Sequence, residues 1–233
     1  MKLCVIPARG GSKRIPSKNL KPFCGKPMIA WSIEAAQAAD LFDEILVSTD
    51  APVIAEAART AGASVPFMRP PELADDHTPT APVMRHAVET FAAERGTPQS
   101  VCCLYATAPF VTAERLREGH ETLQRSGRSY AFTATSFAFP VQRALRIAAD
   151  GGAVAMFPET IGARSQDLEE AYHDAGQFYW GTPEAFLEER PIFDGDSAIV
   201  RLPRAEVQDI DTEEDWQLAE ALFRTARRAQ RDE

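Results

Sequence analysis

The chain has 233 residues, which suits one compact domain with a buried core and is too short for two full-sized domains. Hydrophobic residues make up 45% and charged residues 25%, a composition that excludes wholesale disorder, and no apolar run approaches the roughly 20 residues that cross a bilayer. The four cysteines form no C-x-x-C pair, so we expect reduced thiols in a cytoplasmic protein with no membrane partner.

The net charge of −9 is unevenly distributed along the chain. Residues 1–33 hold seven lysines and arginines and no acid, so they carry +7 and the remaining 200 residues carry −16. A short cationic loop in an acidic protein favours an anionic small molecule as ligand. Nucleic acid would require a broad basic surface, and we therefore expect no nucleic-acid partner.

Apolar runs alternate with helical spacing along the first half of the chain. Strands are predicted at residues 2–7, 44–49, 64–67 and 100–105, and helices from residue 27 to about residue 41 and at residues 53–61, 82–94 and 113–126. Strands that alternate with helices of about 10–15 residues predict an α/β fold with a mostly parallel sheet covered on both faces.

The alternation breaks between residues 130 and 180. Strands are expected at residues 130–136 and 143–148, with a turn at Gly151-Gly152, and we interpret this region as an insertion or arm used for self-association. Strands at residues 178–181 and 198–202 follow. Thr212, with Asp215 three residues later, is expected to cap a last helix.

A glycine-rich basic loop, Arg9-Gly10-Gly11-Ser12-Lys13-Arg14, directly follows the first predicted strand. Glycines let backbone N–H groups approach an oxygen-rich anion, and arginine and lysine add charge-assisted hydrogen bonds. The sequence contains neither a G-x-x-x-x-G-K-[ST] nor a G-x-G-x-x-G motif, so it supports neither a P-loop NTPase nor a dinucleotide dehydrogenase. Taken alone, the loop is equally compatible with a common turn.

The longer pattern IPARGGSKRIPSKN at residues 6–19 is followed by STD at 48–50, RPPELADD at 69–76 and DID at 209–211. Together, and in this order over nearly the whole chain, these motifs resemble the CMP-sugar synthetase (acylneuraminate cytidylyltransferase) family, which activates acidic sugars with CTP. The segments FCGKPMIAWSIEAA, SFAFPVQRAL and RSQDLEEAYHDAGQFYWG are most similar to the pseudaminic acid cytidylyltransferases.

The resemblance implies a three-layer Rossmann-like nucleotidyltransferase fold with a mostly parallel central sheet. It also implies one domain over residues 1–233, with an inserted dimerisation arm at about 137–175, and a homodimer. The implied reaction transfers CMP from CTP to the anomeric hydroxyl of pseudaminic acid, a nine-carbon nonulosonic acid. Pyrophosphate is released, and CMP-pseudaminic acid would serve surface glycan or flagellin glycosylation.

Residue by residue, the resemblance assigns three sets of functional groups. The expected catalytic residues are Arg9, Lys18 and Asp211. The expected nucleotide-binding residues are Ala8, Arg9, Gly10, Ser12, Lys13, Asn19, Arg69 and Thr80. The expected sugar-binding residues are Tyr105, Arg164, Gln166, Gln177 and Tyr179. Tyr105 stands where sialic acid synthetases carry a glutamine, which favours a less hydroxylated acid, and Arg164 is expected to pair with the sugar carboxylate from its own or the partner subunit.

Asp209 and Asp211 are the expected Mg²⁺ ligands, with one or two ions. In an extended segment, residues i and i+2 project from the same side, so both carboxylates can converge on a cation. Mg²⁺ commonly takes one or two carboxylates plus phosphate oxygens. The alternative is that Asp211 belongs to the cap of the last helix and Asp209 is a solvated turn residue.

Two other functions stay open. The first keeps the chemistry and changes the acid to legionaminic acid, N-acetylneuraminic acid or 3-deoxy-octulosonate. The second is a non-catalytic nucleotide-sugar binding protein with the same fold.

Overall fold

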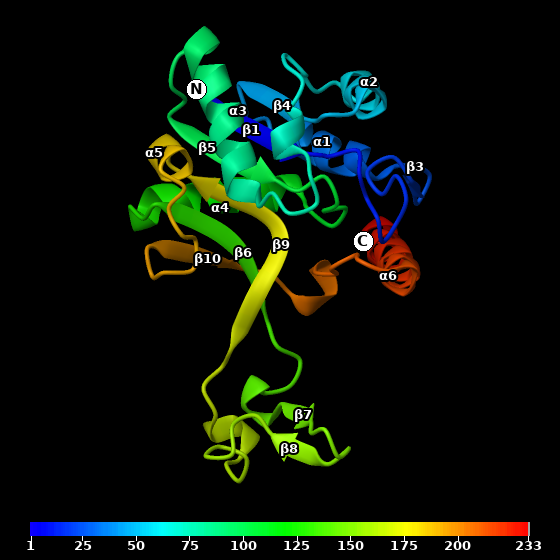
Figure 1. Cartoon of the computed structure of the whole chain (residues 1–233), viewed down its shortest axis with the longest axis vertical. Coiled ribbons are helices and arrows are strands. Elements are labelled where there is room, and N and C mark those ends of the chain that lie inside the picture. The colour runs from blue at the N-terminus through cyan, green and yellow to red at the C-terminus, as the bar shows by residue number, and fades with distance from the viewer. Residues whose placement is uncertain (233) are drawn as a thin grey trace.

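The computed structural model describes residues 1–232 and is built around one six-stranded sheet with the order β10-β6-β9-β5-β1-β4 (Figure 1). The six strands are β1 (Lys2–Pro7), β4 (Glu44–Ser48), β5 (Ser100–Leu104), β6 (Tyr130–Ser136), β9 (Tyr172–Gly181) and β10 (Ser197–Arg201). All are parallel except β9, which pairs antiparallel with both β5 and β6. The predicted mostly parallel sheet is confirmed. Glu233, the last residue of the expected domain, lies outside the described residues.

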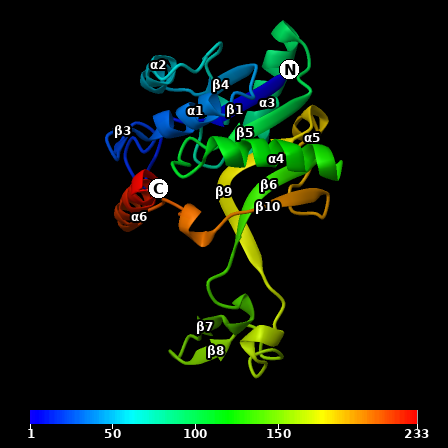
Figure 2. The same ribbon diagram turned by 180° about the vertical axis from the view of Figure 1, so that it is seen from behind.

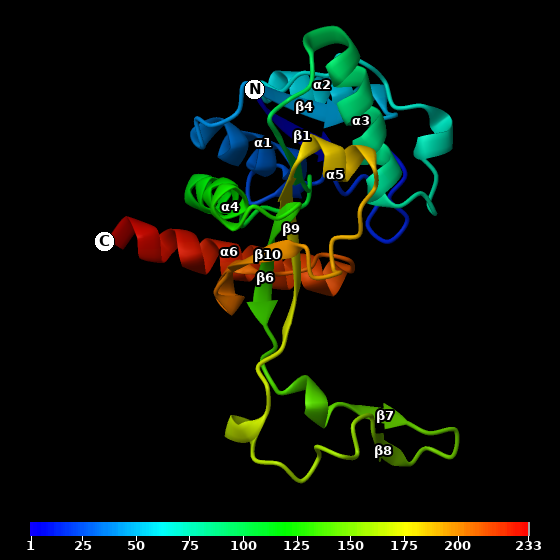
Figure 3. The same cartoon turned by 90° about the vertical axis from the view of Figure 1, so that its left-hand side faces the viewer.

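Helices cover both faces of this sheet (Figures 2 and 3). The helices are α1 (Met28–Ala38), α2 (Pro52–Thr60), α3 (Thr80–Arg95), α4 (Ala113–Ser126), α5 (Pro183–Leu187) and α6 (Glu213–Asp232). Side chains of α1, α2 and α4 form one core with Cys4 and Ile6 of β1, and those of α3 and α5 form another with Leu3 and Val5. Because successive strand residues face opposite sides, one apolar strand supplies both cores, and the result is the expected three-layer α/β fold.

Two strand predictions differ from the structure. A strand is predicted over residues 64–67, but only Ser64 bridges to Leu46. Pro66 follows two residues later and has no N–H with which to continue the ladder. A strand is also predicted at residues 178–181, yet β9 already begins at Tyr172.

The arm, residues 137–171, joins β6 to β9 and projects away from the sheet (Figures 1 and 3). It contains an antiparallel hairpin of β7 (Leu145–Ile147) and β8 (Ala153–Ala155), with Gly151 in the turn at φ +85°. Phe139 and Ile147 in the arm are each 83% exposed. Such exposure of large apolar side chains marks an interaction surface rather than a core.

Helix α6 packs against the segment that follows β1, and this contact holds the carboxyl-terminal part of the chain next to the first loop. Phe23 packs edge-on against Trp216 and Phe223, with ring centroids 5.5 and 5.3 Å apart. The predicted cap is present, because Thr212 Oγ1 accepts from the Asp215 N–H at 3.2 Å and Asp215 Oδ2 accepts from the Thr212 N–H at 2.8 Å. Within the described residues, no helix combines the length and apolarity needed to span a membrane.

Candidate active site

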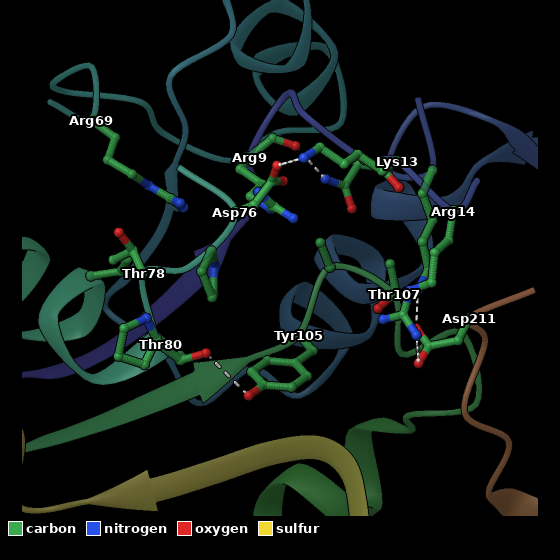
Figure 4. Close-up of a pocket in the computed structure, with 17 residues that line it drawn as sticks. Arg9, Lys13, Arg14, Arg69, Asp76, Thr78, Thr80, Tyr105, Thr107 and Asp211 are labelled. Carbon is green, nitrogen blue, oxygen red and sulfur yellow. Dashed lines mark hydrogen bonds and ion pairs between the residues drawn. The ribbon is translucent and has the colours of Figure 1, made fainter. Parts of the chain in front are cut away.

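A cleft of about 620 Å³ opens at the carboxyl ends of β1 and β5 (Figure 4). Ligands of open α/β sheets bind at this edge. The structure brings together there most of the residues expected to hold the nucleotide, with Tyr105 from the expected sugar set and Asp211 from the expected metal set. The expected residues in the lining are Arg9, Ser12, Lys13, Lys18, Asn19, Arg69, Thr80, Tyr105 and Asp211. Ala8 and Gly10 belong to the same loop but do not line the cleft. We call this cleft the nucleotide cleft.

The glycine loop is held by its neighbours in the fold. The N–H of Gly10 donates to Asp50 Oδ1 at 2.9 Å, and a Cβ on Gly10 would lie 2.9 Å from Cβ of Ala51. Asn19 Nδ2 donates to the Arg9 carbonyl at 3.0 Å. Gly10 thus allows a close approach to the start of α2, and its N–H is already engaged. The charged side chains of the loop, rather than this glycine, face the cleft.

Two of these cations share one carboxylate across the cleft. Arg9 Nη1 donates to Asp76 Oδ1 at 2.6 Å and to the Asp75 carbonyl at 3.0 Å, and Lys13 forms an ion pair with the other oxygen of Asp76. Hydrogen bonds from Lys13 and Arg9 lower the pKa of Asp76. Asp76 ends the RPPELADD motif, but its side chain is not among the nucleotide-binding residues expected from the sequence.

A second carboxylate comes from the opposite end of the chain. Asp211 Oδ2 accepts from Arg14 Nη1 at 2.5 Å, and its Oδ1 accepts from Lys18 Nζ at 3.4 Å. The Asp211 N–H donates to Asp215 Oδ2 at 3.1 Å, so the cap of α6 also holds this residue. The positive amino-terminal loop and the negative DID segment therefore meet at one cleft. Arg14 belongs to the predicted basic loop but not to the expected nucleotide-binding residues, and it too lines the cleft.

Arg69 lines the cleft from a buried position, with 5% exposure. Its Nη2 donates to the Ser48 carbonyl at 2.5 Å, and its Nε donates to Ser48 Oγ at 3.2 Å. Burial lowers the pKa of Arg69 to about 10, and Asp50 partly opposes this shift. The guanidinium is therefore protonated at neutral pH and fixed to the end of β4.

A second cleft of about 470 Å³ adjoins the first, and Tyr105 and Thr107 line both. We call it the acceptor cleft. It contains the expected sugar residues Gln177 and Tyr179, and Asp209 as well. No lysine or arginine is part of its described lining. The Gln177 side chain is buried and donates from Nε2 to the Glu206 carbonyl at 2.6 Å, which fixes its orientation.

The other two expected sugar residues, Arg164 and Gln166, lie elsewhere. Both belong to the arm, and neither lines either cleft of its own chain. They are therefore available only to another molecule or to a second copy of the chain.

The two expected metal ligands line different clefts. Asp209 lines the acceptor cleft and Asp211 the nucleotide cleft. Among residues 1–232 no group of three or more His, Cys, Asp or Glu side chains is arranged to hold a metal. The described residues therefore provide no all-protein cage. Two carboxylates suit an ion such as Mg²⁺, which commonly takes its remaining ligands from substrate phosphate and water.

A cationic cleft at the carboxyl edge of a three-layer α/β sheet, next to a second cleft that shares a wall with it, defines the chain as an enzyme of the nucleotidyltransferase class. The family model described as "Cytidylyltransferase" matches residues 3–192. The chain belongs to this cytidylyltransferase family.

Several curated relatives match over most of the chain. It is 44% identical over 223 residues to the pseudaminic acid cytidylyltransferase of Campylobacter jejuni subsp. jejuni serotype O:2, a match that covers 95% of this chain and 96% of the relative. It is 33% identical over 228 residues to the CMP-N,N'-diacetyllegionaminic acid synthase of Legionella pneumophila, covering 95% of each.

Solved structures agree on the fold. A CMP:2-keto-3-deoxy-manno-octonic acid synthetase complexed with CTP superposes with a TM-score of 0.70 at 18% identity, covering 97% of this chain and 99% of the other. The 4-diphosphocytidyl-2C-methyl-D-erythritol synthase of Anaerococcus prevotii gives a TM-score of 0.64 at 14% identity, covering 96% of each. At these identities the likeness establishes the nucleotidyltransferase fold.

Proposed function

We propose that this enzyme transfers CMP from CTP to the anomeric hydroxyl of pseudaminic acid, releasing pyrophosphate and forming CMP-pseudaminic acid. The observation that carries the proposal is the 44% identity to a pseudaminic acid cytidylyltransferase along 95% of the chain. The geometry agrees with it, since a nucleotide cleft and an acceptor cleft share the wall formed by Tyr105 and Thr107.

In this reaction the anomeric oxygen attacks the α-phosphorus of CTP, the bond from that phosphorus to the β-phosphate oxygen breaks, and the hydroxyl proton is lost to solvent. Such transfer depends on positioning and on cations that oppose the charge on phosphate. Arg9, Lys13 and Lys18 line the nucleotide cleft and supply those cations in the proposal. Ser12 and Asn19 border the same anion site.

The base and ribose of CTP are proposed to lie nearer Arg69 and Thr80, beneath the loop that leads from α2 to α3. Arg69 is fixed by its hydrogen bonds to Ser48, and Thr80 begins α3. A rigid guanidinium is suited to hold a ligand in one orientation because little conformational freedom is lost on binding.

Mg²⁺ is proposed as the metal, held by Asp209 and Asp211. When bound, it would neutralise part of the triphosphate charge. Asp211 also acts before nucleotide arrives, because its carboxylate holds Arg14 and Lys18 at the mouth of the cleft.

Tyr105, Gln177 and Tyr179 are proposed to meet the sugar, because all three line the acceptor cleft. The carboxylate of an acidic sugar is commonly met by an arginine or lysine, and neither lines this cleft within the described chain. We propose that Arg164, with Gln166, reaches it from the partner of a homodimer formed through the arm. We place this dimer in the cytoplasm, since the four cysteines of the described chain are free thiols.

The proposal is tested by pyrophosphate release from CTP and Mg²⁺ with each acid in turn. Pseudaminic acid should give a kcat/KM at least about tenfold above that of legionaminic, N-acetylneuraminic or 3-deoxy-octulosonic acid, as expected when a pocket discriminates one or two substituents. Equal turnover of all four acids would refute the choice of sugar. Preference for legionaminic acid would favour the alternative that the Legionella relative supports.

A non-catalytic binding protein gives a different result. It would bind CTP with Mg²⁺ and release no pyrophosphate with any acid. That outcome would overturn the proposed activity while leaving the nucleotide cleft intact.

A further inference from the structure

Strand β9 contains a bulge that brings two distant residues of the strand together. Tyr179 pairs with Phe132 of β6, and Asp174 pairs with Ala134. The two β9 residues are therefore five positions apart in the sequence, whereas their partners in β6 are only two positions apart. Gly176, at φ +60°, lies inside the bulge. In a regular strand, residues i and i+5 are about 17 Å apart and point to opposite faces. The bulge removes this separation, as bulges beside binding sites commonly do.

The carboxylate of Asp174 makes two hydrogen bonds within this bulge. Its Oδ2 accepts a short hydrogen bond from the Tyr179 hydroxyl, and its Oδ1 accepts from the Gly176 N–H at 3.0 Å. Tyr179 is 5% exposed, so its ring is fixed by packing and its hydroxyl is directed by Asp174. Both side chains line the acceptor cleft.

Tyr105, in the wall between the two clefts, is a neighbour of Tyr179. The two rings lie 5.4 Å apart, centroid to centroid. Tyr105 Oη lies 3.3 Å from Thr80 Oγ1. Its N–H donates to the Gln177 carbonyl at 2.9 Å, which ties Tyr105 to the same bulge.

A carboxylate can only accept hydrogen bonds, so Asp174 sets the direction of its contact with Tyr179. Tyr179 must donate its proton to Asp174, which leaves the Tyr179 oxygen to act as an acceptor toward a ligand in the acceptor cleft. Without the carboxylate, the Tyr179 hydroxyl is free to rotate.

We propose that Asp174 is a positioning residue for the acceptor sugar: it takes the proton of the Tyr179 hydroxyl in a hydrogen bond, so that this tyrosine presents a hydrogen-bond acceptor to donor groups of the sugar. The inference rests on the proposed function, because it assigns the acceptor cleft to the sugar. Asp174 does not itself take part in the bond exchange at phosphorus. Replacing Asp174 should therefore change the KM for the acid.

The test compares Asp174→Ala, Asp174→Asn and Tyr179→Phe with the wild type in pyrophosphate release, varying CTP and the acid separately. Asp174→Ala and Tyr179→Phe should each raise the KM for the acid roughly tenfold, the order expected when a charge-assisted hydrogen bond no longer orients a contact. The KM for CTP should stay within about twofold. Asp174→Asn should recover most of the loss, because its amide oxygen accepts from Tyr179.

The double variant Asp174→Ala/Tyr179→Phe should be no worse than either single variant, because both changes break one contact. Glu170→Ala is the matched control: Glu170 accepts from the Tyr172 hydroxyl in the same way, but neither residue lines a cleft. That variant should keep the wild-type KM for the acid.

An unchanged KM for the acid in Asp174→Ala, an equal rise in both KM values, or additive effects in the double variant would overturn the inference and leave the proposed function standing. A wild-type enzyme that releases no pyrophosphate with any acid would instead overturn the proposed function, and this inference with it.

Discussion

Each cation at the mouth of the nucleotide cleft faces an acid within the same molecule. Asp76 pairs with Arg9 and Lys13, and Asp211 pairs with Arg14 and Lys18. Partly exposed ion pairs of this kind contribute only about 0–1 kcal/mol to the free energy of unfolding. Their stronger consequence concerns binding, because a triphosphate competes with both carboxylates for the same cations.

Asp211→Asn should lower kcat more than about 100-fold, since it removes a proposed metal ligand and an anchor of Lys18. The midpoint of thermal unfolding should stay within about 3 °C, because a partly exposed pair contributes little to stability. Steady-state kinetics and a thermal scan measure the two effects. Glu213→Gln is the control, since Glu213 pairs with Lys21 outside the cleft. An unfolded variant, or near-normal turnover at saturating Mg²⁺, would argue against this role.

Asp76→Asn should bind CTP about three- to tenfold more tightly, because Arg9 and Lys13 lose an internal competitor of the phosphates. Calorimetric titration with CTP at constant Mg²⁺ measures the change. Glu72→Gln, an exposed acid on the same loop, should leave the affinity unaltered. Weaker CTP binding by Asp76→Asn would contradict this account and would assign the carboxylate to the nucleotide itself.

Among the elements, α4 lies unusually close to β9. A Cβ added to Gly119 of α4 would lie 2.5 Å from Cε2 of Phe178 and 2.7 Å from Cδ1 of Trp180. Trp180 also donates from Nε1 to the Leu116 carbonyl at 3.0 Å, so the two elements are locked at this distance. The missing side chain of Gly119 therefore allows the short distance between α4 and β9.

Gly119→Ala should lower the free energy of unfolding. Overpacking a core costs about 1–3 kcal/mol, which exceeds the gain of about 1 kcal/mol from replacing a helical glycine with alanine. Urea denaturation measures the difference. Gly11→Ala, where an added Cβ meets nothing within 4 Å, is the control. A Gly119→Ala protein as stable as the wild type would show that α4 can shift.

Most elements could be predicted from the sequence because their signals are local. Residues 100–104 are apolar in all but the first position and buried, and the expected β5 strand is present. The direction of β9 has no such signal, because an apolar run does not encode which neighbours it will meet. Ser64 makes its bridge, but Pro66 ends the ladder before a strand can form.

The candidate site shows the same division. The motifs that hold Arg9, Lys18 and Asp211 lie in order along the chain, so their presence in one cleft could be expected from the sequence. The side-chain contacts of Asp76 and Asp174 could not, because folding alone brings their partners close. Arg9 lies 67 positions from Asp76, and Tyr179 reaches Asp174 only through a bulge. No spacing in the sequence marks such contacts.

At the scale of the whole molecule, the arm is the part whose surface lacks a partner within the described chain. Six of the exposed large apolar side chains in the described residues belong to it: Phe137, Phe139, Leu145, Ile147, Met156 and Ile161. Figure 3 shows the arm standing clear of the sheet and its helices. An apolar surface of this kind favours association with a second copy.

The wild type should sediment as a dimer, and the double variant Phe139→Asp/Ile147→Asp should sediment as a folded monomer, because charge cannot be buried in an apolar interface. The monomer should lose turnover with the acid while still binding CTP. Val53→Asp is the control, since Val53 is 65% exposed on α2, far along the chain from the arm. A monomeric wild type at micromolar concentration would refute the arm as an interface.

Strand β9 runs from the end of the arm at Tyr172, through its bulge, to Tyr179 in the wall of the acceptor cleft. A partner that holds the arm in place would therefore also restrict the movement of this wall. If a second copy binds the arm, diluting the enzyme should raise the Kd for the sugar before it raises the Kd for the nucleotide. The sugar affinity would then report the fraction of dimer.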